Sequence, residues 1–188
     1  IAYFTTSRGY EPGGLNNGVP YTDGNGNRLL GSFNKEEATQ NELGWKGTIR
    51  DGRTSISVAY FDIDYQDRAF QVVAPNPGGP GLIEYVTNIG DSEQNGLEFE
   101  ITTKATDNLT LSIAAGWVDS EFSKGTVLAD GTDLSGLTPS GTIDNGFLIG
   151  ADYATTLSNG TDFTLSAQWS HTGQGIGMPV VGALKNPS

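Results

Sequence analysis

The most constraining feature of this sequence is an alternation of apolar and polar side chains with a period of two residues. Between residues 109 and 117 every second residue is apolar and the residues between them are small or polar, and similar patterns recur at 163–170, 43–49 and 97–102. A period of two places successive side chains on opposite faces of a β-strand. The sequence therefore predicts an all-β fold whose strands each have one apolar face.

Turn-forming residues separate these segments by breaks of two kinds. Short polar breaks contain Asp51-Gly52, Asp107-Asn108 and Asn159-Gly160, whereas the breaks near 9–35, 75–81 and 123–140 are longer or richer in Gly and Pro. Short and long connections alternate in outer-membrane barrels, where the short turns are periplasmic and the long loops extracellular. We expect an antiparallel up-and-down meander of about seven strands. The predicted strands are approximately 1–8, 38–50, 53–74, 82–104, 109–122, 141–157 and 161–174.

Composition excludes several classes of protein. Ten Lys and Arg against 22 Asp and Glu give a net charge of −12, which argues against a nucleic-acid partner. Cysteine is absent, so a disulfide framework and a thiolate metal site are excluded. The longest apolar run, residues 113–118, is far shorter than the ~18 residues of a membrane helix. A helical membrane protein is therefore excluded, whereas a β-barrel is not.

Two architectures remain compatible with the alternation, a membrane β-barrel and a soluble or surface β-sandwich that serves as a binding or adhesion module. The placement of aromatic residues favours the barrel, because large rings near strand ends or on the apolar face are typical of an interfacial girdle. The residues concerned are Trp45, Tyr60, Trp117, Tyr153 and Trp169.

Several motifs, taken in order, resemble the C-terminal barrel region of TonB-dependent receptors. Residues 3–14 resemble the strand that ends in an aromatic residue, Pro and paired Gly and opens an extracellular loop. Residues 41–46 (N-E-L-G-W-K) resemble the E-L-G-x-K strand, and residues 51–72 resemble the next hairpin with its F-x-I-D-Y-x-D…Q-V strand. Residues 88–100 are similar to the N-x-G-x-A…G-x-E-x-E element, the most specific of the set, and residues 106–111 complete the match.

This resemblance covers residues 1–122 well and residues 141–174 only through generic strand patterning. It implies a transmembrane barrel of about 22 strands whose lumen is filled by a plug domain. It also implies a bacterial outer-membrane transporter, not an enzyme, that takes up a scarce nutrient such as a chelated metal or siderophore, a vitamin or a glycan. The implied partners are the chain's own plug domain, the remaining barrel strands, the TonB energy-coupling complex and outer-membrane lipid and lipopolysaccharide; no cofactor or resident metal is implied.

About seven strands cannot close so large a barrel, and an open sheet leaves edge N–H and C=O groups unpaired, which is costly in lipid. We therefore expect residues 1–188 to be a portion of the transmembrane β-barrel domain, with the plug domain and the remaining strands outside this sequence. The neighbouring strands belong either to a longer polypeptide, which we favour, or to another chain. The TonB complex would act through the N-terminal region that this sequence lacks.

Candidate site residues come from two places. Tyr10, Tyr21 and Arg28 lie in or beside the first long break, and we expect them to contact substrate from an extracellular loop. Glu98 and Glu100 project to one side of a strand, and we expect them to form a polar wall facing the lumen, where they pair with the plug. Paired carboxylates also perform acid–base chemistry, but no nucleophile accompanies them here.

Four further features have a simpler interpretation. Residues 23–27 (D-G-N-G-N) match a Ca²⁺ loop poorly and are better explained as an Asx-rich turn. Asp62 and Asp64 form a second carboxylate pair, expected either on the lumen wall or beside the substrate path. His171 is the only histidine and is expected to be a polar rim residue, and residues 173–177 lack the context of a nucleotide-binding loop.

Overall fold

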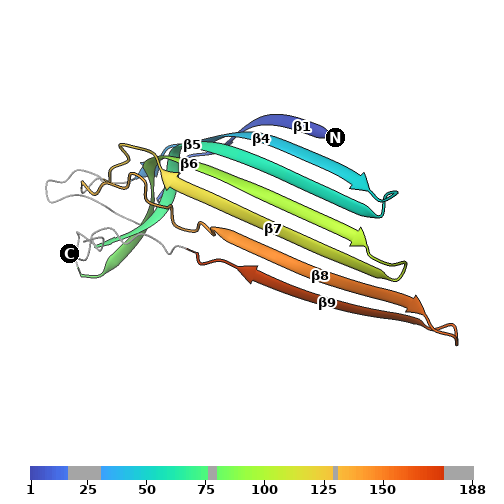
Figure 1. Cartoon of the computed structure of the whole chain (residues 1–188). Helices are drawn as coiled ribbons and strands as arrows, with labels where there is room; N and C mark the ends of the chain where they lie inside the picture. Colours follow the sequence, from blue (N-terminus) through green and yellow to red (C-terminus); the bar gives the residue numbers. More distant parts are fainter. Residues whose placement is uncertain (17–30, 76–79, 129–130, 176–188) are drawn as a thin grey trace, which may run out of the picture.

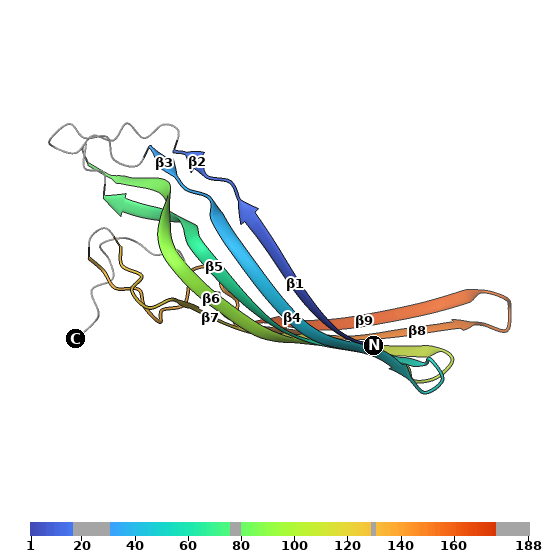
Figure 2. The same ribbon diagram turned by 90° about the horizontal axis from the view of Figure 1, so that it is seen from above.

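The computed structural model describes residues 1–16, 31–75, 80–128 and 131–175. Seven strands form one antiparallel sheet in the order β1-β4-β5-β6-β7-β8-β9 (Figure 1). The two short strands β2 and β3 form a separate two-stranded ribbon (Figure 2). The strands are β1 (Ala2–Glu11), β2 (Gly14–Leu15), β3 (Ser32–Phe33), β4 (Glu36–Ile49), β5 (Thr54–Pro75), β6 (Leu82–Lys104), β7 (Leu109–Phe122), β8 (Asn145–Thr156) and β9 (Asp162–Thr172).

The expectation of an all-β meander of about seven strands is confirmed, because each strand of the large sheet pairs with its neighbours along the chain. The predicted strand from 141 begins later, at Asn145, because residues 142–144 still belong to the preceding loop. β2 and β3 were not predicted, since strands of two residues carry no periodicity. In the part of the chain that the structure describes, no helix is long and apolar enough to cross a membrane.

The pairing register aligns the apolar side chains of successive strands into rows on one face of the sheet. Ile56, Ile101, Ile113, Ile149 and Trp169 form one such row across five strands. Rows above and below it complete an apolar band that runs on β7 from Leu109 to Trp117, about 26 Å at ~3.3 Å per residue. The band comprises Phe4, Leu43, Trp45, Ile56, Val58, Tyr60, Leu97, Phe99, Ile101, Leu109, Leu111, Ile113, Ala115, Trp117, Phe147, Ile149, Ala151, Tyr153, Leu165, Ala167 and Trp169.

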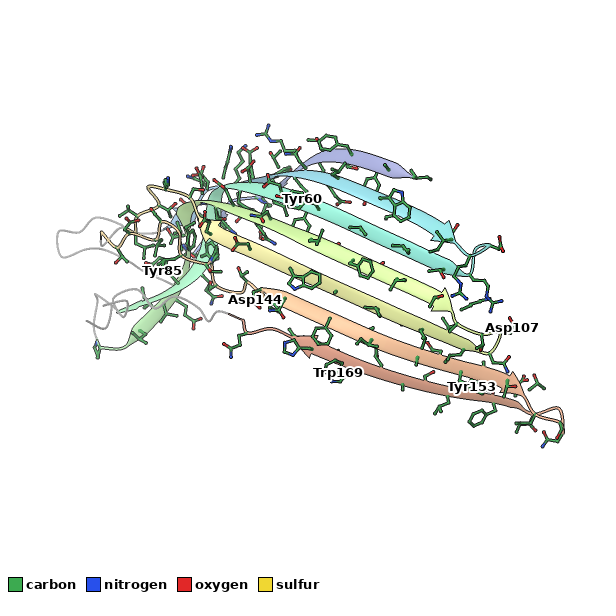
Figure 3. The ribbon with its side chains drawn as sticks, viewed as in Figure 1. Tyr60, Tyr85, Asp107, Asp144, Tyr153 and Trp169 are labelled. Carbon is green, nitrogen blue, oxygen red and sulfur yellow. The ribbon has the colours of Figure 1, made fainter. Side chains whose placement is uncertain are left out.

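Large side chains of the band are exposed in the isolated chain: Leu165 and Trp169 are each 60% accessible, and Ile113 is 41% accessible. A continuous exposed surface of this kind requires an apolar environment, because a soluble monomer rarely exposes so large an apolar patch. Tyr60 lies in the row nearest the long loops, Tyr153 lies near the opposite end and Trp169 lies inside the band (Figure 3). The register places Trp117 in the row of Tyr60 and Trp45 inside the band.

The opposite face of the sheet is polar along most of its length, since the residues between the apolar ones project to that side. On this face the charged residues Glu98 and Glu100 of β6 lie opposite small residues of the neighbouring strands, such as Ser57 of β5 and Ala114 of β7. We refer to this side as the polar face. The two faces therefore differ as the wall of a water-filled or plugged lumen differs from a lipid-facing surface.

The long-loop end has a different organisation. β5 and β6 continue beyond the ends of their neighbours as a raised hairpin, which Figure 2 shows bending beside β2 and β3. A β-bulge marks the bend: the register shifts between Tyr65 and Arg68, and Asp67 has φ of 53°. One face of the raised hairpin contributes Val72 and Ile89 to a small core that Phe122 and Leu134 complete. The only cluster of buried apolar residues in the described chain therefore lies outside the band.

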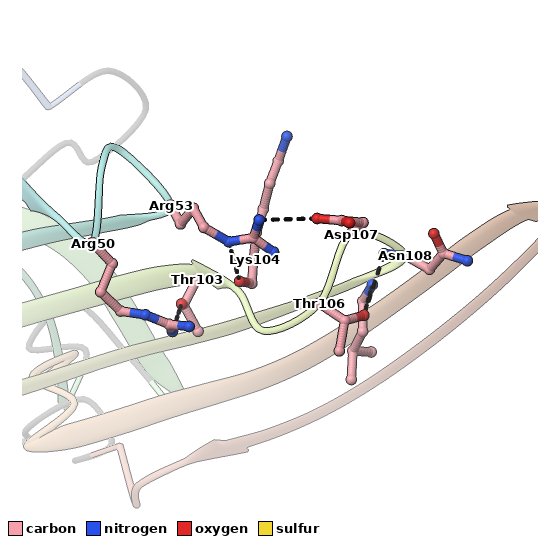
Figure 4. Close-up of polar contacts among 8 residues, drawn as sticks. Arg50, Arg53, Thr103, Lys104, Thr106, Asp107 and Asn108 are labelled. Atoms are coloured by element: carbon pink, nitrogen blue, oxygen red, sulfur yellow. Dashed lines mark hydrogen bonds and ion pairs between the residues drawn. The ribbon is translucent and has the colours of Figure 1, made fainter.

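The short-turn end is closed by tight turns in which glycine and polar side chains relieve local strain. Arg50, Asp51 and Gly52 all have positive φ, the conformation needed to reverse the chain in few residues. Between adjacent turns the Arg53 guanidinium pairs with the Asp107 carboxylate at 2.9 Å, and Arg53 Nε donates to the carbonyl of Lys104 (Figure 4). The Thr106 hydroxyl accepts hydrogen bonds from the Asn108 and Leu109 amides.

Candidate functional site

The polar face carries a cluster of titratable side chains near its middle. Tyr3, Glu42, Lys46, Glu98 and Glu100 line a hollow of about 130 Å³ together with Ser57 and Ala59. The Tyr3 hydroxyl donates to Glu42 Oε1 at 2.6 Å, and the Lys46 ammonium lies 5.5 Å from the centre of the Tyr3 ring. The cluster brings together four strands, because β1, β4, β5 and β6 are adjacent in the sheet.

Gly44 explains how Tyr3 reaches Glu42. The two residues Tyr3 and Gly44 are paired across β1 and β4, and a side chain at Gly44 would overlap the Tyr3 ring. The missing side chain leaves room for the ring to lie across β4, an arrangement that covers a glycine in a strand with a neighbouring aromatic residue. The E-L-G-x-K motif thus contains both the acceptor for Tyr3 and the space for its ring.

The charge of this cluster is unbalanced. Glu42 accepts from Tyr3 and from Gln40 Nε2 at 3.1 Å, so its two oxygens are occupied. Glu98 and Glu100 are exposed and form no ion pair with any described residue. Three carboxylates beside one ammonium group give the middle of the polar face a net negative charge. Such a surface is complementary to a basic partner.

At the long-loop end, the arms of the first loop are fastened to the raised hairpin by side-chain amides. Asn16 binds both backbone groups of Val86: its Nδ2 donates to the carbonyl at 2.8 Å, and its Oδ1 accepts from the amide at 2.9 Å. Reciprocally, the Asn88 side chain accepts from the Asn34 amide at 2.6 Å and donates to the Asn34 carbonyl at 3.2 Å. Each side-chain amide forms the same pair of hydrogen bonds to a backbone as a residue of a neighbouring strand would form. The ribbon of β2 and β3 is thereby held against β6.

The loop that joins β7 and β8 is fastened to the hairpin mainly by apolar contacts. Leu134 is 2% exposed and packs with Val72 and Ile89, and the rings of Phe70 and Phe122 meet edge to face at 5.5 Å. The hydroxyl of Thr126 donates to the carbonyl of Asp91 at 3.2 Å. The hairpin therefore connects two loops that are far apart in the sequence.

A comparison with protein-family models agrees with this geometry. The model described as TonB dependent receptor-like, beta-barrel matches residues 1–185. The chain belongs to this family. As a TonB-dependent receptor barrel it is a bacterial outer-membrane protein of TonB-dependent transport, and its sheet is part of a large barrel. The family consists of transporters rather than enzymes and implies, in general, a plug domain and an interaction with TonB.

The match places the whole described sheet in the receptor barrel, including β8 and β9, for which the motifs gave only generic patterning. The alternative of a soluble β-sandwich is not supported, since it requires a second sheet packed on the apolar face. Within the described residues the large sheet has no such partner.

Of the three predicted substrate residues, the structure describes only Tyr10. Tyr10 lies near the end of β1, is 73% exposed, and falls on the face that carries the apolar band. Tyr21, Arg28 and the Asx-rich segment 23–27 lie outside the described residues. Glu98 and Glu100 lie together on the polar face, where the alternation places them. Their pairing with a plug stays a prediction.

Asp62 and Asp64 are not on the polar face, contrary to the expectation of a shared lumen wall. They follow Tyr60 at intervals of two and therefore project from the same side as the apolar band, beyond its edge. Asp62 is opposite Asn41 on one side and Asn95 on the other, so a polar row ends the band there.

His171 also lies on the band side, where its ring stacks on Phe147 at 5.2 Å. It is near the end of β9, which agrees with a position close to the rim. Residues 173–175 follow β9, and Gly175 forms an isolated bridge with Ile143, whereas residues 176 and 177 lie outside the described chain. Among the described residues no group of three or more His, Cys, Asp or Glu side chains could hold a metal ion.

Sequence reasoning did not identify Arg68 or Asn16 as important, and it included Asn88 only as the first residue of the N-x-G-x-A motif. The side chains of Asn16 and Asn88 bind backbone groups of segments that are distant in the sequence, and no local pattern predicts such a contact. Arg68 owes its setting to a β-bulge, which a regular alternation does not predict. The pairing of Tyr3 with Gly44 could have been found from one signal in the sequence, an aromatic residue and a glycine in adjacent predicted strands.

Proposed function

We propose that this chain forms about a third of the wall of a plugged outer-membrane barrel that imports a scarce nutrient: a chelated metal or siderophore, a vitamin or a glycan. The observation that carries the proposal is the contrast between the two faces of one sheet, an exposed apolar band on one side and a charged polar face on the other. Residues 1–188 would be a portion of the barrel domain, with the plug and the remaining strands contributed by sequence beyond this portion.

In this arrangement the apolar band faces the lipid and the polar face lines the lumen. The short turns face the periplasm and the raised hairpin with its two fastened loops faces the cell exterior, which follows the alternation of turn lengths in outer-membrane barrels. Lipid and lipopolysaccharide contact the band and the polar row beyond it. Tyr21 and Arg28 are our candidates for contact with substrate on the outside. Tyr10 shares that role only where the chain rises beyond the membrane, because lower on β1 its side of the sheet faces lipid.

The negative cluster of Glu42, Glu98 and Glu100 supports a role in seating the plug. Carboxylates that form no ion pair within the described chain, on a wall that encloses a folded domain, attract basic side chains of that domain. Such contacts hold the plug while the lumen is closed and have to be broken or rearranged when TonB pulls on it. The wall thereby contributes to coupling without contacting TonB itself.

The proposal is tested by nutrient uptake in the source bacterium with the receptor gene deleted. Cells are supplied with ferric chelates, cobalamin or oligosaccharides as limiting nutrients, with and without an active TonB. We expect uptake of one nutrient class to be lost on deletion, to return with the wild-type receptor, and to stay absent when TonB is inactive. Uptake that is restored equally well without TonB would contradict the proposed function.

A further inference from the structure

Arg68 occupies an unusual setting on the polar-face side of the long-loop end. The β-bulge places it immediately above Tyr65, which is paired with Ser92. Its guanidinium carbon lies 4.3 Å from the centre of the Tyr65 ring and 4.9 Å from the centre of the Phe70 ring. Arg68 Nη1 donates to Ser92 Oγ at 2.9 Å, and Ser92 is only 1% exposed. The side chain is thus held by two rings and one buried hydroxyl.

Aromatic rings that stack on a guanidinium group cover its faces and leave the N–H groups at its edges free to form hydrogen bonds. The five N–H donors of arginine lie in the plane of the group, and stacking on aromatic rings does not consume them. Ser92 accepts one hydrogen bond from this plane. The guanidinium has further N–H donors besides the one that Ser92 engages, and two neighbouring donors form the fork that suits the two oxygens of a carboxylate or phosphate.

The charge of Arg68 is not neutralised by an adjacent acid. Among the described residues, ion pairs join Arg8 and Lys35 to Glu37 and Arg53 to Asp107, and none involves Arg68. Glu36 acts on Arg68 electrostatically from farther away, while its Oε2 accepts from the Ala69 amide at 2.9 Å. Burial lowers the pKa of Arg68, and Tyr65 and Glu36 oppose that effect. A half-buried cation without a direct counter-ion is the kind of group that binds an anion.

We propose that Arg68 binds an anionic group of the imported nutrient, a carboxylate or phosphate, edge-on through the guanidinium donors that Ser92 leaves free. The inference rests on the proposed function and narrows it to nutrients that carry such a group. Tyr65 and Phe70 orient the guanidinium and shield it from water, which strengthens its hydrogen bonds to an anion. A ligand that enters from the outside then meets Arg68 before it reaches the negative cluster deeper on the same face.

The test uses the full-length receptor purified in a non-ionic detergent and titrated calorimetrically with two probes, citrate and pyrophosphate, at constant ionic strength. We expect saturable binding of at least one probe, weakened about ten-fold or more by Arg68→Gln. Arg68→Lys keeps the charge but not the planar fork, so we expect its affinity for the probe to fall between those of the wild type and Arg68→Gln. Arg50→Gln is the matched control, because Arg50 lies in a short turn at the opposite end and contacts Thr103.

Three results would overturn the site: no binding of either probe to the wild type, binding by Arg68→Gln equal to that of the wild type, or full affinity in Arg68→Lys. The first would arise if Arg68 were paired with a carboxylate elsewhere in the receptor. Folding of each variant is verified by its heat-dependent migration in gel electrophoresis, and Arg68→Lys, the closest replacement, remains informative if Arg68→Gln misfolds. If Arg68→Gln leaves TonB-dependent uptake unchanged, this result counts against the anion site but not against transport. If the receptor binds the anions but no TonB-dependent uptake is found, the proposed function alone is contradicted.

Discussion

The two halves of β5 and β6 follow opposite rules of burial. In the half that belongs to the wall, apolar side chains such as Tyr60 and Leu97 are 48% and 41% exposed, and no second layer of described residues covers them. In the raised half, Val72 is fully buried and Ile89 is 7% exposed against Leu134 of the β7–β8 loop. The same two strands therefore leave apolar side chains exposed over one stretch, which the proposed function assigns to lipid, and form a small buried core over the next. Solvent, rather than strand propensity, decides which rule applies.

The largest expected effect comes from a charge in the wall. Ile113 lies in the central row of the apolar band, so Ile113→Arg should destabilise the folded barrel by about 3 kcal/mol, the cost of arginine near the bilayer midplane. The measurement is reversible folding into lipid vesicles as a function of urea. Thr102→Arg is the control, because it lies at a similar depth on the polar face. Equal losses from the two variants would break the distinction between the faces.

The next effect concerns the small core. Leu134→Ala removes a buried side chain and should cost about 2 kcal/mol, confined to the loop and the raised hairpin. Hydrogen exchange of the amides in residues 123–144 should rise, while exchange in the wall stays unchanged. Leu137→Ala in the same loop is the control, since Leu137 is 48% exposed. Unfolding of the whole sheet by Leu134→Ala would show that the two regions are one cooperative unit.

A smaller effect is expected from the amide that fastens the first loop. Asn16→Ala leaves both backbone groups of Val86 without this partner, and we expect a local loss of about 1 kcal/mol. Faster exchange of the Val86 amide reports it. Asn16→Asp keeps an acceptor for that amide and should slow the exchange again. If the alanine variant exchanges at the wild-type rate, the contact does not hold the loop.

The smallest effect belongs to the short-turn end. Asp107 is almost fully exposed, and its ion pair with Arg53 joins two turns in water. Exposed pairs contribute little, so Asp107→Ala should cost at most about 0.5 kcal/mol. The measurement is the urea midpoint of folding into lipid vesicles, determined for Asp107→Ala as for Ile113→Arg. A loss as large as that of Leu134→Ala would indicate that the turns, and not only the band, stabilise the wall.

Much of the wall could be predicted because its rule is local. Alternation over residues 109–117 determined which side chains share a face, and the turn residues Asp51-Gly52 and Asn159-Gly160 determined where strands reverse. The prediction that Asp62 and Asp64 lie on the lumen wall was wrong because the alternation was not counted along their own strand. Counted from Tyr60, their spacing of two already places them on the band side.

The long-loop end could not be predicted in this way. The β-bulge at Asp67 interrupts the period of two, so the direction of Arg68 is not readable from its spacing to Tyr65. The contact of Asn16 with Val86 joins residues 70 positions apart, and no pattern in either segment requires it. The candidate substrate residues of the first loop were chosen by chemistry alone and stay predictions for the same reason.

By itself the sequence determined the strand period, the two faces, the positions of the tight turns and, through its motifs, the family. These properties depend on neighbours one to four residues away, and backbone geometry propagates them along each strand. Only the tertiary structure decided which polar groups meet: Tyr3 with Glu42 across Gly44, two asparagines with distant backbone, and Arg68 between two rings. Those contacts depend on register, bulges and loop packing, which arise when strands that are remote in the chain are brought side by side.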